Sequence, residues 1–340
     1  MHRASARCEQ RQCEEAIGLL EKANRIAPAN PAICFHLGFC HSGGCTQHSL
    51  VDRAMAAAYL RRALLLAETG ADLLLRARIL NALGNVYSHS GADAAQLRQA
   101  IEYHSEAGEI YARLSQSDEW AREEFNQAGA WCELPEGQFP DKWARGIEHY
   151  ENALTVRTRS HDPQAYASTM LNLGTALRQL PAGEKRQNVL KAVRCYRQVS
   201  RVYKCKTSPK QFADLSNNLG TACMSYPSQD EAGAARHARY ARRHFKQALE
   251  IWNCAEYGCY YALAQYNLGC AYLKLLSSSR CLETAMRCFV AAVDCAKSCG
   301  QAEVERLASA QLKTLVAGMT KTDRTCAAPV SQCKGGEQCQ

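Results

Sequence analysis

A short pattern that returns along most of the chain constrains the fold more than any other feature. It is a Leu-Gly pair inside an apolar stretch of helical length, and its equivalents recur at spacings of 46, 44, 46, 46 and 49 residues. In chain order the six positions are Leu37-Gly38, Leu83-Gly84, Gln127-Ala128, Leu173-Gly174, Leu219-Gly220 and Leu268-Gly269. A regular repeat of this length predicts a stack of similar units, each packed against its neighbours.

A second pattern follows in the next apolar stretch of each repeat. Ala192 is followed by Tyr196 four residues on and by Val199 seven residues on, and these positions share one face of a helix. The equivalent triplets are Ala16/Leu20/Ala23, Ala56/Leu60/Ala63, Ala100/His104/Ala107, Gly146/Tyr150/Ala153, Ala241/Phe245/Ala248 and Ala285/Phe289/Ala292. Small residues on either side of a large one let a neighbouring helix approach closely. The two patterns together predict an all-α solenoid of helix hairpins.

The residues around these marks resemble a known family. The unit P-x-x-(aromatic)-A, then N-L-G-x-A, then L-P-x-G, then A-(V/I)-x-x-Y, read from Pro163 to Tyr196, is similar to the long tetratricopeptide (TPR) repeats of bacterial TPR-CHAT proteins, kinesin light chain and LGN scaffolds. The resemblance covers roughly residues 14–318 and includes no CHAT protease region. It implies a right-handed superhelix, and a scaffold or adaptor that binds a peptide segment of a partner protein in a concave groove.

The repeat positions divide the chain into four parts. Residues 1–30 are predicted to form a leading half-repeat and residues 31–300 six TPR-like repeats. Residues 301–319 are predicted to form a capping helix, which the end of a repeat array needs for solubility. The polar, Gly-containing residues 320–340 are expected to be a disordered tail.

Composition and motifs narrow the functional class. The chain has 47% hydrophobic and 22% charged residues, typical of a folded protein, and it lacks a signal peptide or an apolar run of about 18 residues. We therefore expect a cytoplasmic protein with no membrane partner. Phosphate-loop, dinucleotide-binding, zinc-protease and nucleophile-elbow motifs are all missing from the sequence, so we expect no catalysis and no cofactor.

Asparagines beside the Leu-Gly marks are the first candidates for ligand contact. The predicted peptide-binding residues are Asn81, Asn85, Asn126, Asn172, Asn217, Asn218 and Asn267. By the resemblance, this position faces the groove, and side-chain amides can hold an extended peptide through its backbone. The alternative is that these amides bond only to neighbouring repeats. A carboxylate clamp would add matched cations, and Arg78 and Arg122 fit, but Ser168 and Asp214 occupy the equivalent positions in the next two repeats.

Positive charge is concentrated in one region. The net charge is +8, and residues 176–250 hold fifteen Lys and Arg against five Asp and Glu. The predicted basic ridge comprises Arg194, Arg197, Arg201, Arg236, Arg239, Arg242 and Arg243. It could bind an acidic protein segment or, as the alternative function, a polyanion or nucleic acid. Nucleic acid is the less favoured partner because stacking aromatics are not interleaved on this face. A solvated face without a partner is the remaining interpretation.

The nineteen cysteines are expected to be mostly reduced packing residues, because many lie within apolar helical patterns. Two dense groups stand out, one at Cys34, His36, Cys40, His41, Cys45 and His48, the other at Cys281, Cys288, Cys295 and Cys299. Neither contains the closely paired ligands of a zinc site, so no metal is expected. A thiol- or metal-responsive sensor remains a second alternative function.

Overall fold

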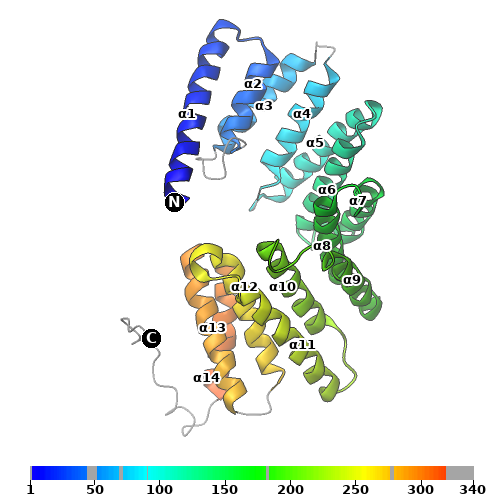
Figure 1. The fold of residues 1–340 in the computed structure, drawn as a ribbon, viewed down its shortest axis with the longest axis vertical. Coiled ribbons are helices and arrows are strands. Elements are labelled where there is room, and N and C mark those ends of the chain that lie inside the picture. Colours follow the sequence, from blue (N-terminus) through cyan, green and yellow to red (C-terminus); the bar gives the residue numbers. More distant parts are fainter. Residues whose placement is uncertain are drawn as a thin grey trace. The chain divides into compact units, whose positions relative to one another are not determined.

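The computed structural model describes residues 2–43, 52–68, 72–89, 91–180, 184–275 and 279–318, with side chains outside the description at residues 2–13, 279 and 318. Every regular element in these ranges is an α-helix (Figure 1). In chain order the helices are α1(His2–Ile26), α2(Pro31–His41), α3(Arg53–Ala67), α4(Leu73–Tyr87), α5(Ala94–Arg113), α6(Ser117–Glu133), α7(Lys142–Val156), α8(Pro163–Gln179), α9(Lys185–Val199), α10(Pro209–Ser225), α11(Glu231–Leu249), α12(Cys254–Leu273), α13(Ser279–Cys299) and α14(Ala302–Gly318).

The chain divides into two compact units, residues 1–183 and residues 184–340. In the first unit the helix hairpins are α2–α3, α4–α5 and α6–α7, with α1 packed on α2 and α8 packed on α7. In the second unit the hairpins are α10–α11 and α12–α13, with α9 packed on α10 and α14 packed on α13. Serial hairpins of this kind confirm the all-α, TPR-type solenoid class. The boundary falls within the repeat marked by Gly174 and Ala192, so its two helices are described separately.

Local signals at the helix starts explain where each element begins. Asp93 and Gln96 form a reciprocal capping box at α5, which satisfies two of the backbone N–H groups that a helix start leaves unpaired. Asp162 caps α8, and Pro163 occupies its first turn, where a missing N–H costs nothing. Side-chain caps also begin other helices, at Asn30, Asp52, Asp72, Asp230 and Asn253.

The two repeated sequence patterns meet inside four of the described hairpins, whereas in α6–α7 the first-helix position is Ala128 and the close approach is at Gly146 of the second helix, where a Cβ would lie 3.1 Å from the carbonyl oxygen of Ala128. A Cβ at Gly38 would lie 2.5 Å from Cγ of Leu60, and a Cβ at Gly220 would lie 2.5 Å from Cε1 of Phe245. The same packing joins Gly84 to His104 and Gly269 to Phe289. The large residue of the second helix therefore fills the space left by the missing side chain of the first, which is why the spacing between the two patterns repeats.

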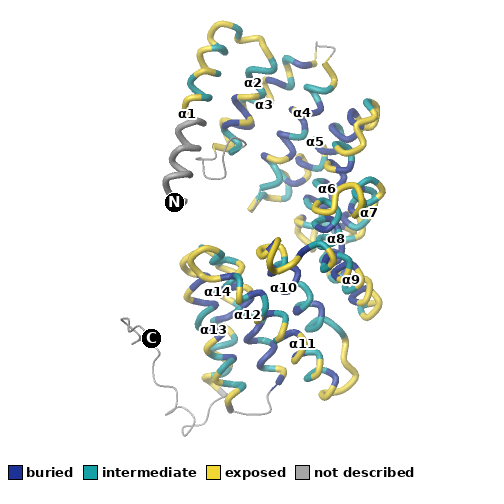
Figure 2. The backbone as a smooth tube through the Cα atoms, viewed as in Figure 1, coloured by how far each residue is buried: buried dark blue, intermediate teal, exposed yellow. Residues whose placement is uncertain are grey.

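Burial follows these contacts along the chain (Figure 2). The marks Leu60, Phe245 and Phe289 are almost fully buried, whereas no described side chain of α1 is buried. The predicted capping helix corresponds to α14, and the predicted tail at residues 320–340 lies outside the described residues. Among the helices that the structure describes, none is both long enough and apolar enough to cross a membrane.

Candidate peptide-binding site

The predicted asparagines lie on the first helices of the repeats. Most of their side chains are hydrogen-bonded to other side chains of the protein. They occupy α4, α6 and α8 in the first unit and α10 and α12 in the second. Asn172 forms a hydrogen bond with the buried hydroxyl of Tyr150 on α7. In the second unit Asn267 Nδ2 donates to Asn217 Oδ1 at 3.3 Å, and Asn217 is itself buried. These three amides join neighbouring helices, which matches the structural alternative.

Asn81 belongs to a buried polar network in the first unit. Its Nδ2 donates to Glu123 Oε1 at 2.5 Å, and its Oδ1 accepts a hydrogen bond from Asn85 Nδ2 at 3.2 Å. The other oxygen of Glu123 lies 2.6 Å from His104 Nδ1, and both His104 and Glu123 are fully buried. A buried carboxylate needs such partners, so this network holds α4, α5 and α6 together. The sequence singled out His104 as a repeat mark and Asn81 and Asn85 as candidate groove residues, but it did not single out Glu123.

Three amides remain accessible for a ligand. Asn85 is exposed and donates through one N–H only to Asn81, which leaves its carbonyl oxygen without a protein donor among the described contacts. Asn126 on α6 and Asn218 on α10 are half-buried, and their side chains form no hydrogen bond with another residue in the described ranges. The first unit thus offers Asn85 and Asn126 on two successive first helices.

Two arginines accompany these amides in the first unit. Arg78 on α4 and Arg122 on α6 are both exposed. Burial and then Glu123 raise the pKa of Tyr111 to about 12, while Arg122 and Arg78 act in the opposite direction on the same phenol. The two cations therefore lie close to one side chain, as expected for matched positions on adjacent first helices.

A third cation, which the sequence did not single out, extends this row. Arg157 follows the end of α7, and its Nη1 donates to Oγ1 of Thr169 on α8 at 3.2 Å. Its guanidinium lies 4.7 Å from the ring centroid of Phe125. Burial, and then the nearby charge of Arg122, lower the pKa of Arg157 below its usual value. On α8 the position equivalent to Arg78 and Arg122 is Ser168, which carries no charge. Arg157, directly after the end of α7, supplies a positive charge there instead.

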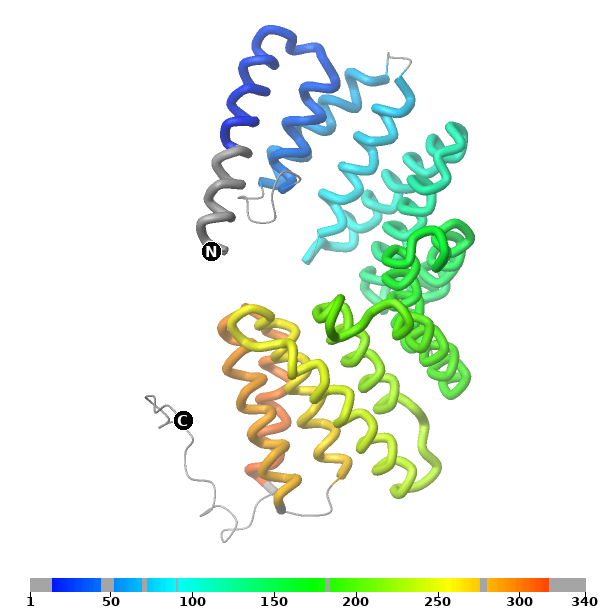
Figure 3. The backbone as a smooth tube through the Cα atoms, in the orientation of Figure 1, coloured from blue at the N-terminus to red at the C-terminus, as the bar shows by residue number. Residues whose placement is uncertain are grey.

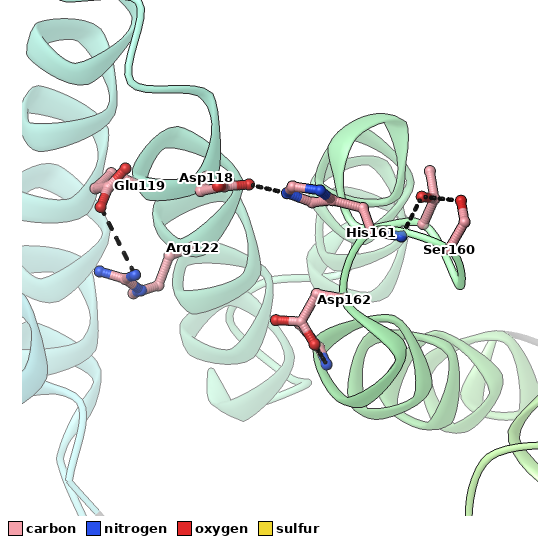
Figure 4. Close-up of polar contacts among 8 residues, drawn as sticks. Asp118, Glu119, Arg122, Ser160, His161 and Asp162 are labelled. Atoms are coloured by element: carbon pink, nitrogen blue, oxygen red, sulfur yellow. Dashed lines mark hydrogen bonds and ion pairs between the residues drawn. The ribbon is translucent and has the colours of Figure 1, made fainter.

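Acidic residues border the row and partly offset its charge, since Asp162, Glu123 and Asp118 act on the pKa of Arg157 against burial and Arg122 (Figure 4). Asp118 Oδ1 lies 2.8 Å from His161 Nε2, in the loop before α8, and Glu119 Oε1 lies 4.0 Å from Arg122 Nη2. The side chains of all four residues are a third or more exposed, so these ion pairs are weak and screened by solvent. Arg122 can exchange its distant partner for a ligand carboxylate at small cost.

The predicted basic ridge lies entirely in the second unit, on α9, the turn after it, and α11. Six of its arginines are exposed, and Arg242 is half-buried, with its guanidinium 5.7 Å from the ring centroid of Tyr272. An open hollow of about 550 Å³ on α11 gathers part of the ridge. Its lining consists of Arg239, Tyr240, Arg242, Arg243, Lys246, Gln247 and Glu250.

Tyr240 corrects one expectation about this surface. The sequence was interpreted as lacking aromatic residues among the arginines, yet Tyr240 is 56% exposed and lines the hollow beside Arg239 and Arg243. The error arose because the ridge was assigned from charge alone, although position 240 shares the exposed side of α11. An aromatic ring is therefore available next to the cations.

The cysteines differ from expectation at one place. Cys254 and Cys295 form a disulfide between α12 and α13, so not all of the thiols are reduced. Cys34, Cys40 and Cys288 are buried, as predicted for packing residues, whereas Cys45 and His48 lie outside the described residues. Within the part of the chain that is described, no three His, Cys, Asp or Glu side chains gather as metal ligands would.

Comparison with known proteins adds little to this geometry. No protein-family model matches the sequence, and no curated protein matches it. Among solved structures, the crystal structure of yeast Tom70 is similar with a TM-score of 0.43 and 10% sequence identity, over 91% of this chain. The chain spans 59% of the length of that structure. The fold class rests on the helix hairpins and their glycine contacts rather than on this likeness.

Proposed function

We propose that this chain is a protein-interaction scaffold whose first unit binds an extended, carboxylate-bearing peptide segment of a partner. The observation that carries the proposal is the row Arg78, Arg122 and Arg157, accompanied by the accessible amides of Asn85 and Asn126. Guanidinium groups recognise carboxylates with charge-assisted hydrogen bonds, and amides satisfy the peptide backbone. An acidic segment fits both kinds of group.

The roles within this row differ. Arg78 and Arg122 are exposed and reach the ligand with little rearrangement, whereas Arg157 is positioned by Phe125 and Thr169. A side chain held in place loses less conformational freedom on binding, so Arg157 contributes orientation as well as charge. Asn81, Asn172, Asn217 and Asn267 hold neighbouring helices in this proposal, while Asn85 and Asn126 of the first unit contact the peptide.

The test measures binding of a fluorescein-labelled decapeptide rich in Asp and Glu, with a free C-terminal carboxylate, by fluorescence anisotropy. Replacing Arg122 by Ala should weaken binding about tenfold or more, since a hydrogen bond to a charged group contributes about 1.5–3 kcal/mol. Arg113→Ala is the matched control, because Arg113 is exposed on α5 and, among the described residues, forms an ion pair only with Glu109. Equal affinity of the wild type and Arg122→Ala, or equal binding of a Lys-rich decapeptide, would contradict the proposal.

A second candidate function is polyanion binding by the hollow on α11. Four cations line it against the single carboxylate of Glu250, and in the described ranges none of the four forms an ion pair. Tyr240 adds a ring on which a nucleobase can stack. The test is a salt titration with fluorescent single-stranded RNA. Log affinity should fall linearly with log salt, and Tyr240→Ala should weaken binding. No retention of RNA at low salt would remove this candidate.

A further inference from the structure

Four cysteines meet where α12 begins and α13 ends. Cys254 and Cys259 lie in the first turns of α12, and Cys295 and Cys299 lie in the last turns of α13. The two helices run side by side as a hairpin in the second unit (Figure 3). Cys254 and Cys295 are disulfide-bonded, with 6.0 Å between their Cα atoms and 41 residues between them in sequence.

The other two cysteines form a second pair beside this disulfide. The side chains of Cys259 and Cys299 are joined by a hydrogen bond, and Cys259 Sγ also lies 3.7 Å from the carbonyl oxygen of Cys299. Both residues are half-buried rather than sealed in the core. They are therefore a dithiol in contact, accessible to a small oxidant.

Gly258 brings the two pairs into one cluster. A Cβ at this position would lie 3.1 Å from Cβ of Cys299, 3.7 Å from Sγ of Cys295 and 3.8 Å from Sγ of Cys299. The first of these distances is tighter than an ordinary contact, so the missing side chain leaves the room that the two α13 cysteines occupy. The backbone of α12 thus permits both of its own cysteines to approach α13.

The local backbone gives the disulfide a mechanical role. Tyr257 has non-helical φ of −127° and ψ of 36°, which interrupts α12 directly after its first turn. Cys254 lies before this kink. Its partner Cys295 packs with Ala262, Ala296 and Val304, and Val304 belongs to α14. The disulfide therefore fastens the first turn of α12 to the place where α13 contacts the capping helix.

We propose that these four cysteines form a redox site in which a peroxide converts Cys259 and Cys299 into a second disulfide, and reduction of both pairs releases the first turn of α12. The thiolate of one cysteine attacks one oxygen of hydrogen peroxide; the O–O bond breaks, an S–O bond forms, and the departing hydroxide takes up the proton that this thiol lost and leaves as water. The sulfur of the other cysteine then attacks the sulfenic sulfur, the S–O bond breaks, and the departing hydroxide takes up the second thiol proton and leaves as water. Two thiols lose two hydrogen atoms, and the peroxide is reduced to two waters.

The contact between the thiols provides for both steps. Cys259 and Cys299 are hydrogen-bonded to each other, so a sulfenic acid formed on one of them lies beside the thiol that resolves it. A dithiol reductant reverses both disulfides by exchange. This site goes beyond peptide binding and lies in the unit that does not carry the peptide row.

The first test maps disulfides in the full chain before and after treatment with hydrogen peroxide. Remaining thiols are blocked with N-ethylmaleimide, and peptides are analysed by mass spectrometry without reduction. A Cys254–Cys295 link should be present throughout, and a Cys259–Cys299 link should appear after peroxide, with the loss of two hydrogen atoms. Exposed Cys205 is the control thiol. Alkylated Cys259 and Cys299 at a peroxide dose that oxidises Cys205 would overturn the proposal.

The second test measures separately the oxidation of Cys259 and Cys299 and the effect of the disulfide on the first turn of α12. Cys259→Ser should trap a sulfenic acid on Cys299, and Cys299→Ser should trap one on Cys259, each detectable as a dimedone adduct. Dithiothreitol should increase hydrogen exchange of the amides in residues 254–257, and the same increase should occur in Cys205→Ser. Unchanged exchange in these residues on full reduction would overturn the mechanical role of the disulfide.

Discussion

The two units build the same hairpin contact from different chemistry. In the first unit Gly84 faces His104, a fully buried imidazole that needs Glu123 as its partner. In the second unit the corresponding glycines face Phe245 and Phe289, whose rings need no polar partner. The steric role of the position is the same in both units, but the first unit fills it with apolar Leu60 at Gly38 and with polar His104 at Gly84, whereas the second unit uses Phe rings.

This difference changes what each unit depends on. In the first unit a second buried carboxylate, Glu124, accepts hydrogen bonds from His149 and Asn152 at 2.9 Å, so two carboxylates on α6 join three neighbouring helices. Directional bonds of this kind fix one helix register but leave charges stranded when a partner is lost. The second unit relies on aromatic packing and a disulfide, which tolerate changes in charge and respond instead to volume and to reductant.

The largest expected effect is the loss of one partner from the buried pair. Glu123→Ala should lower the free energy of unfolding of the first unit by about 3–5 kcal/mol, because His104 and the Asn81 amide both lose their acceptor. Urea denaturation, with hydrogen exchange to assign the loss to α4–α6, measures the change. The second unit should keep its exchange protection.

The matched variant for this prediction makes the first unit resemble the second. His104→Phe combined with Glu123→Leu replaces the polar pair with apolar side chains, an exchange that is often neutral or stabilising by about 1–4 kcal/mol. This double variant should be more stable than Glu123→Ala alone. If the double variant is less stable than Glu123→Ala, then His104 and Glu123 contribute more to stability than satisfying each other's hydrogen bonds. The contrast drawn between the two units would then be wrong.

The next effect concerns the covalent bond of the second unit. Cys254→Ser should lower the free energy of unfolding of that unit by about 2–4 kcal/mol, the typical contribution of a disulfide that closes a loop. Dithiothreitol should have the same effect on the wild type and little on the variant. A similar loss of stability in the first unit, which contains no disulfide among its described residues, would break the proposed division.

A smaller effect tests the glycine contact itself. In Gly220→Ala the new Cβ would lie 2.5 Å from Cε1 of Phe245, so overpacking should destabilise the second unit by about 1–3 kcal/mol. Gly18→Ala is the control, since nothing lies within 4 Å of a Cβ there, and alanine in a helix should be stabilising by about 0.5–1 kcal/mol. Equal effects of the two substitutions would mean that propensity, not close packing, explains the repeated glycine.

Much of the fold could be predicted from the sequence, because the repeated residues are the ones that pack between neighbouring helices. The pairing of Gly220 with Phe245 could be predicted, since spacing alone sets which helix faces meet. Which of the candidate groove residues are available to a ligand was harder to predict. The same Asn position is bonded to Tyr150 at Asn172 but has no described side-chain partner at Asn126, and only tertiary neighbours decide between these states.

The residues that the sequence missed act from outside the repeated positions. Arg157 lies after a second helix rather than on a first one, so no comparison of equivalent positions would select it. The pairing of Cys254 with Cys295 was also missed, because these residues are 41 positions apart on two different helices. Such contacts arise from three-dimensional proximity, which a one-dimensional repeat pattern does not contain.

The smallest expected effect concerns a histidine of the second unit that, unlike His104 of the first unit, has no carboxylate as its hydrogen-bond partner. His104 contacts a carboxylate, whereas half-buried His244 on α11 contacts only Gln247, through Nδ1 at 3.2 Å from Oε1. Burial, with a smaller contribution from Arg243, lowers the pKa of His244 below its usual 6.5. The unfolded chain therefore takes up a proton that the folded chain resists, so this contribution to stability is complete above pH 6.5 and is lost as the pH falls.

In urea denaturation of the second unit, the wild type should lose stability relative to His244→Gln as the pH is lowered from about 7.5 to about 5.5. All other titrating groups are the same in the two proteins, so their contributions cancel in the difference in stability between them. A constant difference between the two proteins over this range would show that His244 titrates alike in the folded and unfolded chain. In that case the partial burial of His244 would give the second unit no acid sensitivity.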